Sequence, residues 1–405
     1  MNFYYITTSV FSLQSKSFYY MKASQVKEVF IKKFGENFRL FAAPGRINLI
    51  GEHTDYNNGF VLPAAIDKRV YLAITPSSDS VSRIISVDFD QSVEFNIHES
   101  NQELPHWAKY PYGVVKEIQA LGHSLKGFNA VFGGDIPSGA GLSSSAALES
   151  VFAVALNKLF NLNIDKLSLA KIGQKAEHNY AGVNCGIMDQ FASIHGKEGH
   201  VMKLDCRSLE FEYFPLELGE YELILVDTQV KHSLASSEYN RRRYDCEEGV
   251  MILSSQMPQV RSLRDVRSKD VYPYKGILGE QIFLCCEYVT EENERVIDTC
   301  KALAEGNLQR VGELLYQSHH GLSRKYFVSC DELDLLVESA KNVDGVLGAR
   351  MMGGGFGGCT INLIKSDAVN AFRQKASEDF SRKFGKKPEF YRVNIGNGAT
   401  ELNIS

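Results

Sequence analysis

The sequence predicts a mixed α and β protein, and two observations lead to this prediction. Runs with strand-like and helix-like patterns alternate from Phe38 to the end of the chain, without a low-complexity linker or an internal repeat. The composition, with 44% hydrophobic, 11% aromatic and 23% charged residues, is that of a globular protein. At 405 residues the chain is long enough for two or three packed units with sizeable cores.

Strands are expected where short runs are rich in β-branched or aromatic residues. In chain order these runs are Val70 to Thr75, Arg83 to Val87, Gly127 to Gly133, His200 to Lys203, Tyr221 to Asp227, Cys359 to Ile364 and Phe390 to Val393. Helices are expected where apolar residues recur with a spacing near 3.6. The clearest carries Leu148, Val151, Phe152, Ala155, Leu156 and Leu159, and others run from Leu167 to Tyr180, Glu238 to Leu253, Glu291 to Ala304, Leu308 to Ser323 and Ala368 to Phe384.

Two halves of similar size are expected, with their boundary in the short loop from Pro215 to Glu220. The N-terminal domain would then cover residues 21–215 and the C-terminal domain residues 216–405. Residues 1–20 are interpreted as a leader, either disordered or produced by a start codon placed too early. No Lys or Arg precedes their apolar stretch and no small-residue cleavage site closes it, as a secretory signal would require, whereas Met21 opens a stretch with helical apolar spacing.

Charge, hydropathy and cysteine usage argue against several classes of function. The 44 Lys and Arg and the 49 Asp and Glu give a net charge of −5 and a pI near 6.1, too mild and too well mixed for a nucleic-acid surface. No apolar run approaches the roughly 18 residues of a membrane span. The eight cysteines form no CxxC pair and are typical of reduced thiols in a cytoplasm. No nucleic-acid or membrane partner is therefore expected.

The first of three segments that suit chemistry runs from Pro44 to Tyr56. It packs Glu52, His53 and Asp55 into four residues next to an Asn-Asn-Gly turn. Several acceptors and a donor thus converge on one loop, which suits a polyhydroxylated ligand because a carboxylate can accept from two hydroxyls at once. A polar turn that satisfies its own backbone would give the same pattern. A zinc site is disfavoured because the His-Glu-x-x-His spacing is missing.

The second segment runs from Gly133 to Ser145 and leads directly into the clearest helix. Its small residues would let the backbone approach a phosphate group, and the free N–H groups and positive dipole end of the helix would face that anion. A P-loop NTPase is excluded because no Gly-Lys-Ser/Thr follows the glycines. An ordinary Ser N-cap after a glycine-rich turn is the alternative interpretation.

The third segment, Met352 to Gly358, has five glycines around Phe356. Three of them satisfy GxGxxG, but they precede an expected strand instead of following a strand and opening a helix, which excludes a Rossmann dinucleotide loop. A backbone loop that closely approaches another segment or a ligand fits this pattern, and so does a tight hairpin turn.

Together these segments resemble the motifs of a known family. The run Gly45 to Tyr56, Gly-Arg-Ile-Asn-Leu-Ile-Gly-Glu-His-Thr-Asp-Tyr, is similar to the signature of the galactokinases. The Ser-rich segment and Gly353 to Gly358 resemble the second and third motifs of the GHMP small-molecule kinases, the superfamily to which galactokinases belong. The resemblance runs from about Phe41 to Cys359. It implies an α+β, two-lobed GHMP kinase fold, with a mixed-sheet N-terminal domain, an α+β C-terminal domain and the active site between them.

The resemblance also implies a reaction. In this family the γ-phosphoryl group of ATP goes to the anomeric hydroxyl of D-galactose, giving galactose 1-phosphate and ADP, the first step of galactose metabolism. Asp189 matches the catalytic aspartate and Arg46 the arginine that pairs with it, an arrangement that suits phosphoryl transfer. Ser145 and Glu177 match the pair that holds Mg²⁺. ATP and Mg²⁺ are thus the expected cofactors, and a cytoplasmic monomer is expected.

Further residues match binding positions of the family. Those matching sugar-binding positions are Glu52, His53, Thr54, Asp55, Gly186 and Tyr239. Those in the nucleotide loop are Gly139, Ala140, Gly141, Leu142, Ser143, Ser144 and Ser145. Arg241 to Arg243 fit either a phosphate clamp or a salt-bridged surface. Trp107 fits either the aromatic or apolar wall that the family places near the adenine or a place in the core.

Two kinds of alternative function stay open. A close relative could phosphorylate N-acetylgalactosamine, or a different sugar such as arabinose. A non-catalytic sensor could instead bind galactose and ATP and signal by contacting a partner protein. The presence of Arg46, Asp189, Ser145 and Glu177 argues against the sensor, because a sensor needs the binding site but not the chemistry.

Overall fold

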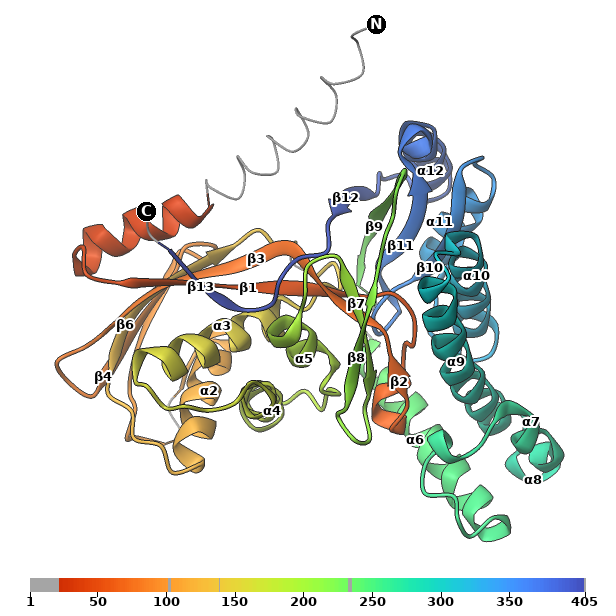
Figure 1. Cartoon of the computed structure of the whole chain (residues 1–405), viewed down its shortest axis with the longest axis horizontal. Helices are drawn as coiled ribbons and strands as arrows, with labels where there is room; N and C mark the ends of the chain where they lie inside the picture. Colours follow the sequence, from red (N-terminus) through yellow and green to blue (C-terminus); the bar gives the residue numbers. More distant parts are fainter. Residues whose placement is uncertain (1–21, 101–102, 138, 232–234, 404–405) are drawn as a thin grey trace, which may run out of the picture.

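The computed structural model describes residues 22–100, 103–137, 139–231 and 235–403. Within these residues the strands form three sheets, and the two larger sheets belong to two lobes that lie side by side (Figure 1). The expected leader, residues 1–20, lies outside the described residues.

The first lobe is built on a six-stranded mixed sheet, as the family resemblance implied. In spatial order its strands are β13 (Thr400–Leu402), β1 (Arg39–Asn48), β3 (Pro63–Pro76), β6 (Phe128–Gly134), β4 (Val81–Ser86) and β5 (Gln91–Asn96). β4 and β6 are parallel, whereas the other neighbours are antiparallel. The pairing of β1 with β3 shifts register between Pro44 and Arg46. This bulge accommodates Pro44, which has no N–H group for the ladder.

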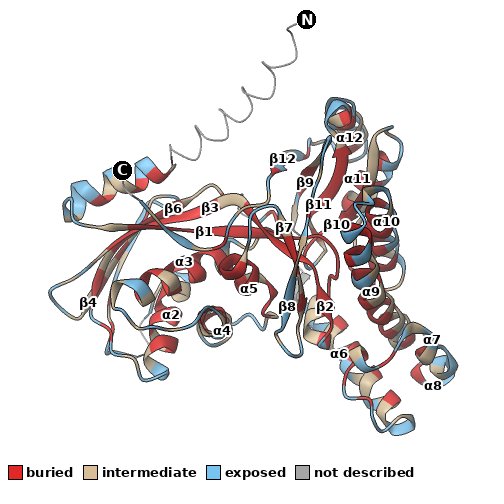
Figure 2. Ribbon diagram, viewed as in Figure 1, coloured by how far each residue is buried: buried red, intermediate tan, exposed pale blue. Residues whose placement is uncertain are grey.

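Helices cover both faces of this sheet (Figure 1). The N-terminal helix, residues 22–34, packs Val26 and Phe30 against one face, in a core that includes Leu40. Successive side chains of a strand point to opposite faces, so Phe41 joins the core on the other side. The helices on that side are α2 (Lys109–Ala120), α3 (Ser144–Leu159), α4 (Lys166–Ala176) and α5 (Met188–His195). Figure 2 shows that the central strands are buried along most of their length.

The second lobe is built on a four-stranded antiparallel sheet. In spatial order its strands are β10 (Val346–Met351), β11 (Gly357–Lys365), β9 (Tyr221–Lys231) and β12 (Glu389–Val393). Its helices are α6 (Ala235–Gln256), α7 (Ser268–Val271), α8 (Lys275–Leu278), α9 (Glu280–Ala304), α10 (Leu308–Arg324), α11 (Asp331–Lys341) and α12 (Val369–Phe384). The third sheet lies between the lobes and contains β2 (Phe60–Val61), β7 (His200–Asp205) and β8 (Phe211–Pro215). α9 contacts both β2 and β8, so it ties this sheet to the second lobe.

Every strand and helix expected from the sequence is present, although several begin earlier or end later than expected. The largest difference is in α9, which begins at Glu280 instead of Glu291. Other elements were not expected, and two of these matter for the site. β1 contains Pro44 and Gly45, which mark a turn in local pattern, but the bulge keeps both residues inside the strand. α5 is only eight residues long, too short for a clear periodic pattern.

The chain crosses between the lobes more than once. The loop predicted as a domain boundary, Pro215 to Glu220, separates β8 from β9, which belong to different sheets. The last strand, β13, then returns to the first lobe and pairs Leu402 with Leu40 of β1. No described helix is long and apolar enough to span a membrane. All eight cysteines lie within the described residues, and none is in a disulfide.

Candidate active site

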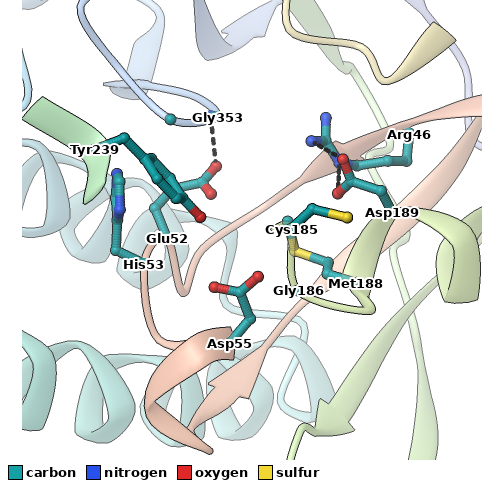
Figure 3. A pocket seen from close by; sticks show the side chains of 11 residues that line it. Arg46, Glu52, His53, Asp55, Cys185, Gly186, Met188, Asp189, Tyr239 and Gly353 are labelled. Carbon is teal, nitrogen blue, oxygen red and sulfur yellow. Dashed lines mark hydrogen bonds and ion pairs between the residues drawn. The ribbon is translucent and has the colours of Figure 1, made fainter. Parts of the chain in front are cut away.

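A polar cavity of about 160 Å³ opens where the two lobes meet (Figure 3). A single water molecule needs roughly 10–15 Å³, so a considerably larger polar ligand fits. The lining residues come from β1 and the turn after it, the start of α5, α6 and the β10–β11 loop: Arg46, Glu52, His53, Asp55, Cys185, Gly186, Met188, Asp189, Tyr239, Gly353 and Gly354. The cavity thus joins segments that are far apart in the sequence.

Arg46 and Asp189 form a two-pronged ion pair at one side of this cavity. Arg46 lies beside the bulge of β1, and Asp189 lies in the first turn of α5. Arg46 Nε donates to Asp189 Oδ1 at 2.7 Å and Nη2 donates to Oδ2 at 2.8 Å. Burial of Arg46 would lower its pKa, but the charge and hydrogen bonds of Asp189 raise that pKa above its usual value. Two parallel N–H···O bonds therefore fix the orientation of this pair.

His53 lies on the opposite wall, next to Tyr239 (Figure 3). Their ring centroids are 5.3 Å apart. His53 has a φ of 62°, in the left-handed region, and its Nδ1 lies 2.7 Å from the hydroxyl of Tyr56. Burial lowers the pKa of His53 to about 3, so the ring is neutral at physiological pH. It offers the cavity a neutral imidazole, which can act as a donor or as an acceptor to a hydroxyl group.

Asp55 and Gly186 are packed against each other at the base of the cavity. A Cβ atom on Gly186 would lie 1.9 Å from Asp55 Oδ2, so only glycine leaves room for this carboxylate. Burial, together with the charges of Asp189 and Glu52, raises the pKa of Asp55 to about 6. Asp55 is therefore a carboxylate near neutral pH that has lost much of its water and can accept hydrogen bonds from a ligand.

Thr54 has a different position from the one expected for a sugar-binding residue. Its side chain is fully buried, and its hydroxyl group is directed at the carbonyl oxygens of Gly51, at 2.9 Å, and Phe60, at 2.5 Å. It does not line the cavity. Thr54 instead holds the turn that presents its neighbours, His53 and Asp55.

The predicted phosphate loop precedes α3 directly. Gly139, Gly141 and Ser143 have positive φ angles of 81°, 73° and 56°. Ser143 is the N-cap residue, but its side chain makes no capping hydrogen bond. It donates instead to Asp189 Oδ2. The interpretation as an ordinary Ser cap is therefore wrong. Because the Ser143 side chain does not bond to the first N–H groups of α3, those groups can donate to an anion, as a phosphate site requires.

Ser145 and Glu177 lie together beside this loop. Ser145 Oγ donates to Glu177 Oε1 at 3.2 Å, and Gln190 Nε2 donates to Glu177 Oε2 at 2.7 Å. Burial and the charge of Asp189 raise the pKa of Glu177. No cluster of three or more His, Cys, Asp or Glu side chains suited to a metal occurs among the described residues. One carboxylate and one hydroxyl nevertheless suit Mg²⁺, which takes few protein ligands and completes its shell with water and phosphate oxygens.

The third glycine segment forms the hairpin loop between β10 and β11. Its backbone also reaches the cavity, because Gly353 N donates to Glu52 Oε1 at 2.8 Å (Figure 3). A Cβ atom on Gly353 would lie 3.9 Å from the carbonyl oxygen of Gly141, so this loop runs alongside the predicted phosphate loop. The hairpin and the close-approach interpretations are therefore both confirmed.

Arg241 to Arg243 and Trp107, which each fitted two interpretations, have definite places in the structure. Arg241 and Arg243 each pair with an acid one turn along α6, Asp245 at 2.8 Å and Glu247 at 2.9 Å, as a salt-bridged surface predicts. Arg242 is buried and donates to the carbonyl oxygen of Tyr326 at 2.6 Å. Trp107 is 7% exposed and belongs to the main core of the first lobe.

Several residues at the site were not predicted as site residues. Cys185 and Met188 line the cavity, but they belong to a segment in which the family resemblance singled out only Gly186 and Asp189. Arg350, behind the cavity, was missed because it lies in a strand. A charged residue in the apolar run Val346–Met351 was the one available signal, since a charge in a buried strand needs a partner.

Comparison with family models covers much of the chain. A model described as the galactokinase galactose-binding signature matches residues 28–76. Models of the N-terminal domain and of the C-terminal region of GHMP kinases match residues 109–197 and 300–382. Each of the three segments that suit chemistry lies within one of these matches.

Similar proteins span nearly the same length. A galactokinase of Thermosipho africanus is 44% identical over 89% of this chain and 99% of its own length. One from Bacillus subtilis is 40% identical over 93% of this chain and 98% of its own. The crystal structure of a Lactococcus lactis galactokinase complexed with galactose superposes with a TM-score of 0.89 at 37% identity, covering 94% of this chain and 99% of that one. A Methanococcus jannaschii mevalonate kinase, at 18% identity and a TM-score of 0.64, shares the fold.

Proposed function

The chain belongs to the galactokinases of the GHMP kinase superfamily and phosphorylates galactose with ATP, and we propose that Arg46 and Asp189 carry the transfer. The observation that supports this proposal is the fixed Arg46–Asp189 ion pair, which faces a polar cavity next to the uncapped start of α3. A carboxylate that meets the acceptor hydroxyl and a helix N-terminus that meets phosphate oxygens are what phosphoryl transfer needs.

On the sugar side, we assign binding to Glu52, His53, Asp55, Tyr239 and the backbone of Gly186. The two carboxylates accept from sugar hydroxyls, and neutral His53 contributes one donor or acceptor. The ring of Tyr239 covers one face of the cavity (Figure 3). The finer assignment, D-galactose with its anomeric hydroxyl as acceptor, follows from the family and from these hydrogen-bonding groups.

Asp189 has the central role in the transfer. The anomeric hydroxyl donates to this carboxylate, which orients the oxygen toward the γ-phosphorus and accepts the proton as the new O–P bond forms. The proton moves late because the transition state is loose and the attacking oxygen becomes acidic only as bonding proceeds. Arg46 holds Asp189 in a fixed orientation through two hydrogen bonds, and Ser143 contributes a third hydrogen bond to the same carboxylate.

The phosphate end of ATP is assigned to residues 139–145 and the first turn of α3. Ser145 and Glu177 would hold Mg²⁺, which when bound neutralises phosphate charge. The GHMP motifs imply ATP as the phosphoryl donor. We further assign the enzyme to the cytoplasm, consistent with its unpaired cysteines, and expect it to act as a monomer.

A coupled ADP-release assay with Mg-ATP tests the activity and the sugar at once. Galactose, N-acetylgalactosamine, glucose and arabinose are compared at equal concentrations, and galactose should give the highest kcat/KM. The control is Asp298→Asn, which removes an exposed carboxylate from α9 and should not change the rate. A higher kcat/KM for N-acetylgalactosamine or arabinose would overturn the assignment of the sugar. Absence of ADP release with every sugar would favour the sensor.

A further inference from the structure

Arg350 is the largest fully buried side chain of the described residues and lies directly behind the cavity. Its Nε donates to the carbonyl oxygen of Leu49 at 2.8 Å, and its Nη1 donates to that of Met351 at 2.6 Å. Its Nη2 donates to the carbonyl oxygen of Asn48 and to Glu52 Oε1. One guanidinium thus joins the end of β1, the start of the third glycine loop and a carboxylate of the cavity.

Glu52 connects the cavity to the third glycine loop. It lines the cavity, and its Oε1 accepts from Arg350 at 3.1 Å and from the backbone N–H of Gly353 at 2.8 Å. Only 3% of the residue is exposed, so both hydrogen bonds are shielded from water. A ligand hydroxyl that bonds to this carboxylate therefore also restricts the position of Gly353.

Gly353 in turn lies beside the phosphate loop. The Gly353 and Met352 backbone runs along Gly141, since a Cβ atom at Gly141 would lie 3.8 Å from the Met352 carbonyl oxygen. The loop contains five glycines, four of them with positive φ, so it has many conformations to lose when it becomes ordered. A contact that orders the loop before nucleotide arrives lowers the entropic cost of binding that nucleotide.

We propose that Glu52 and Arg350 couple the two substrate sites, so that galactose and nucleotide each increase the affinity for the other. Arg350 is a positioning residue in this scheme, because it acts on the sugar through Glu52 and on the loop through Met351. The inference rests on the proposed function, which places galactose in the cavity and phosphates at residues 139–145. Because such coupling is reciprocal, either ligand can be titrated.

Calorimetric titration of galactose, with and without saturating Mg-ADP, measures the coupling without turnover. In the unaltered protein we expect the Kd for galactose to fall at least fivefold when Mg-ADP is present, within the range typical of coupled sites. In Glu52→Ala galactose binds more weakly overall, and the ratio of the two Kd values should fall to about one. Arg350→Lys loses the fork of donors and should show a ratio between these values. The control Arg39→Lys, on β1 at a solvent-exposed pair with Glu401, should keep the full ratio.

Hydrogen exchange provides a second measurement, independent of any variant that fails to fold. Galactose alone should slow amide exchange in the peptide that contains residues 351–358 of the unaltered protein. Equal Kd values with and without Mg-ADP, or a full ratio in Glu52→Ala, would overturn the proposal, and so would unchanged exchange in this peptide. Failure of the proposed function is a different result, because the unaltered protein would then not bind galactose in the first titration.

Discussion

Gly186→Ala is the most specific perturbation that the site allows. The added Cβ atom would lie 1.9 Å from Asp55 Oδ2 and 2.7 Å from its Cγ, whereas ordinary contact begins at 3.4 Å. The carboxylate must therefore move by about 1.5 Å. Gly186 is not among the glycines with positive φ, so alanine adds no backbone strain and the whole effect arises from this contact.

The expected loss of affinity follows from the hydrogen bonds that Asp55 offers to the sugar. A hydrogen bond to a charged group contributes about 1.5–3 kcal/mol, so two of them amount to at least about 3 kcal/mol. Since each 1.4 kcal/mol is a factor of ten, the Kd for galactose should rise by roughly 100-fold or more. The Kd for Mg-ADP, measured without sugar, should change by less than about threefold because the phosphate loop does not contact Asp55.

Calorimetry on three variants and a control tests this reasoning. Asp55→Ala removes the side chain that the new Cβ atom would meet, so the double variant should bind galactose no more weakly than Asp55→Ala alone. Gly276→Ala, at a glycine of α8 where an added Cβ atom would meet no other atom within 4 Å, should leave both affinities unchanged. Additive losses in the double variant, or an unchanged Kd for galactose in Gly186→Ala, would refute the role given to Asp55.

Three further predictions concern the chemistry, the pH dependence and the N-terminus. Asp189→Asn keeps the shape of the side chain but removes its charge, so kcat should fall on the order of a hundredfold or more while calorimetry still detects galactose binding. A near-normal kcat would remove Asp189 from the mechanism. Because burial raises the pKa of Asp55 to about 6, its ionised form is lost as the pH falls through that value. The Kd for galactose should therefore be about tenfold higher at pH 5 than at pH 7. If the Kd for galactose of Asp55→Asn changed as much between these two pH values, another group would be responsible. A chain that starts at Met21 keeps the helix that packs Val26 onto the sheet, so it should retain full activity and the same melting temperature. Phe30→Ala, in that helix, should instead lower the free energy of unfolding by about 3–5 kcal/mol. A melting temperature several degrees lower in the shortened chain would show that residues 1–20 contribute to stability.

Local sequence pattern was sufficient for the main elements and for the family. Periodicity identified the long helices and the central strands, and three motifs led to the galactokinases, which the family models and relatives confirm. Local pattern was not sufficient for β1, because Pro and Gly are typical of turns. Only the pairing with β3, which has a bulge next to Pro44, shows that Pro44 and Gly45 lie inside a strand. Strand assignment at such a position depends on a neighbour that is distant in sequence.

The assembly of the site depended on the tertiary fold. The distance between Arg46 and Asp189 could not be read from residues 143 positions apart, and neither could the turn of Ser143 away from its own helix and toward Asp189. The same holds for Thr54, which the family resemblance groups with the sugar-binding residues but whose hydroxyl group packing directs at backbone carbonyl oxygens.

The sequence therefore contained the chemical groups of this enzyme and the local turns that display them, because residue types and short-range backbone preferences act over a few positions. The family resemblance paired Asp189 with Arg46, but how Glu52 meets both Arg350 and Gly353 depended on the two lobes packing against each other. Such contacts arise from burial and hydrogen bonding between segments hundreds of residues apart. The periodicity of apolar residues over a few positions does not predict such long-range contacts.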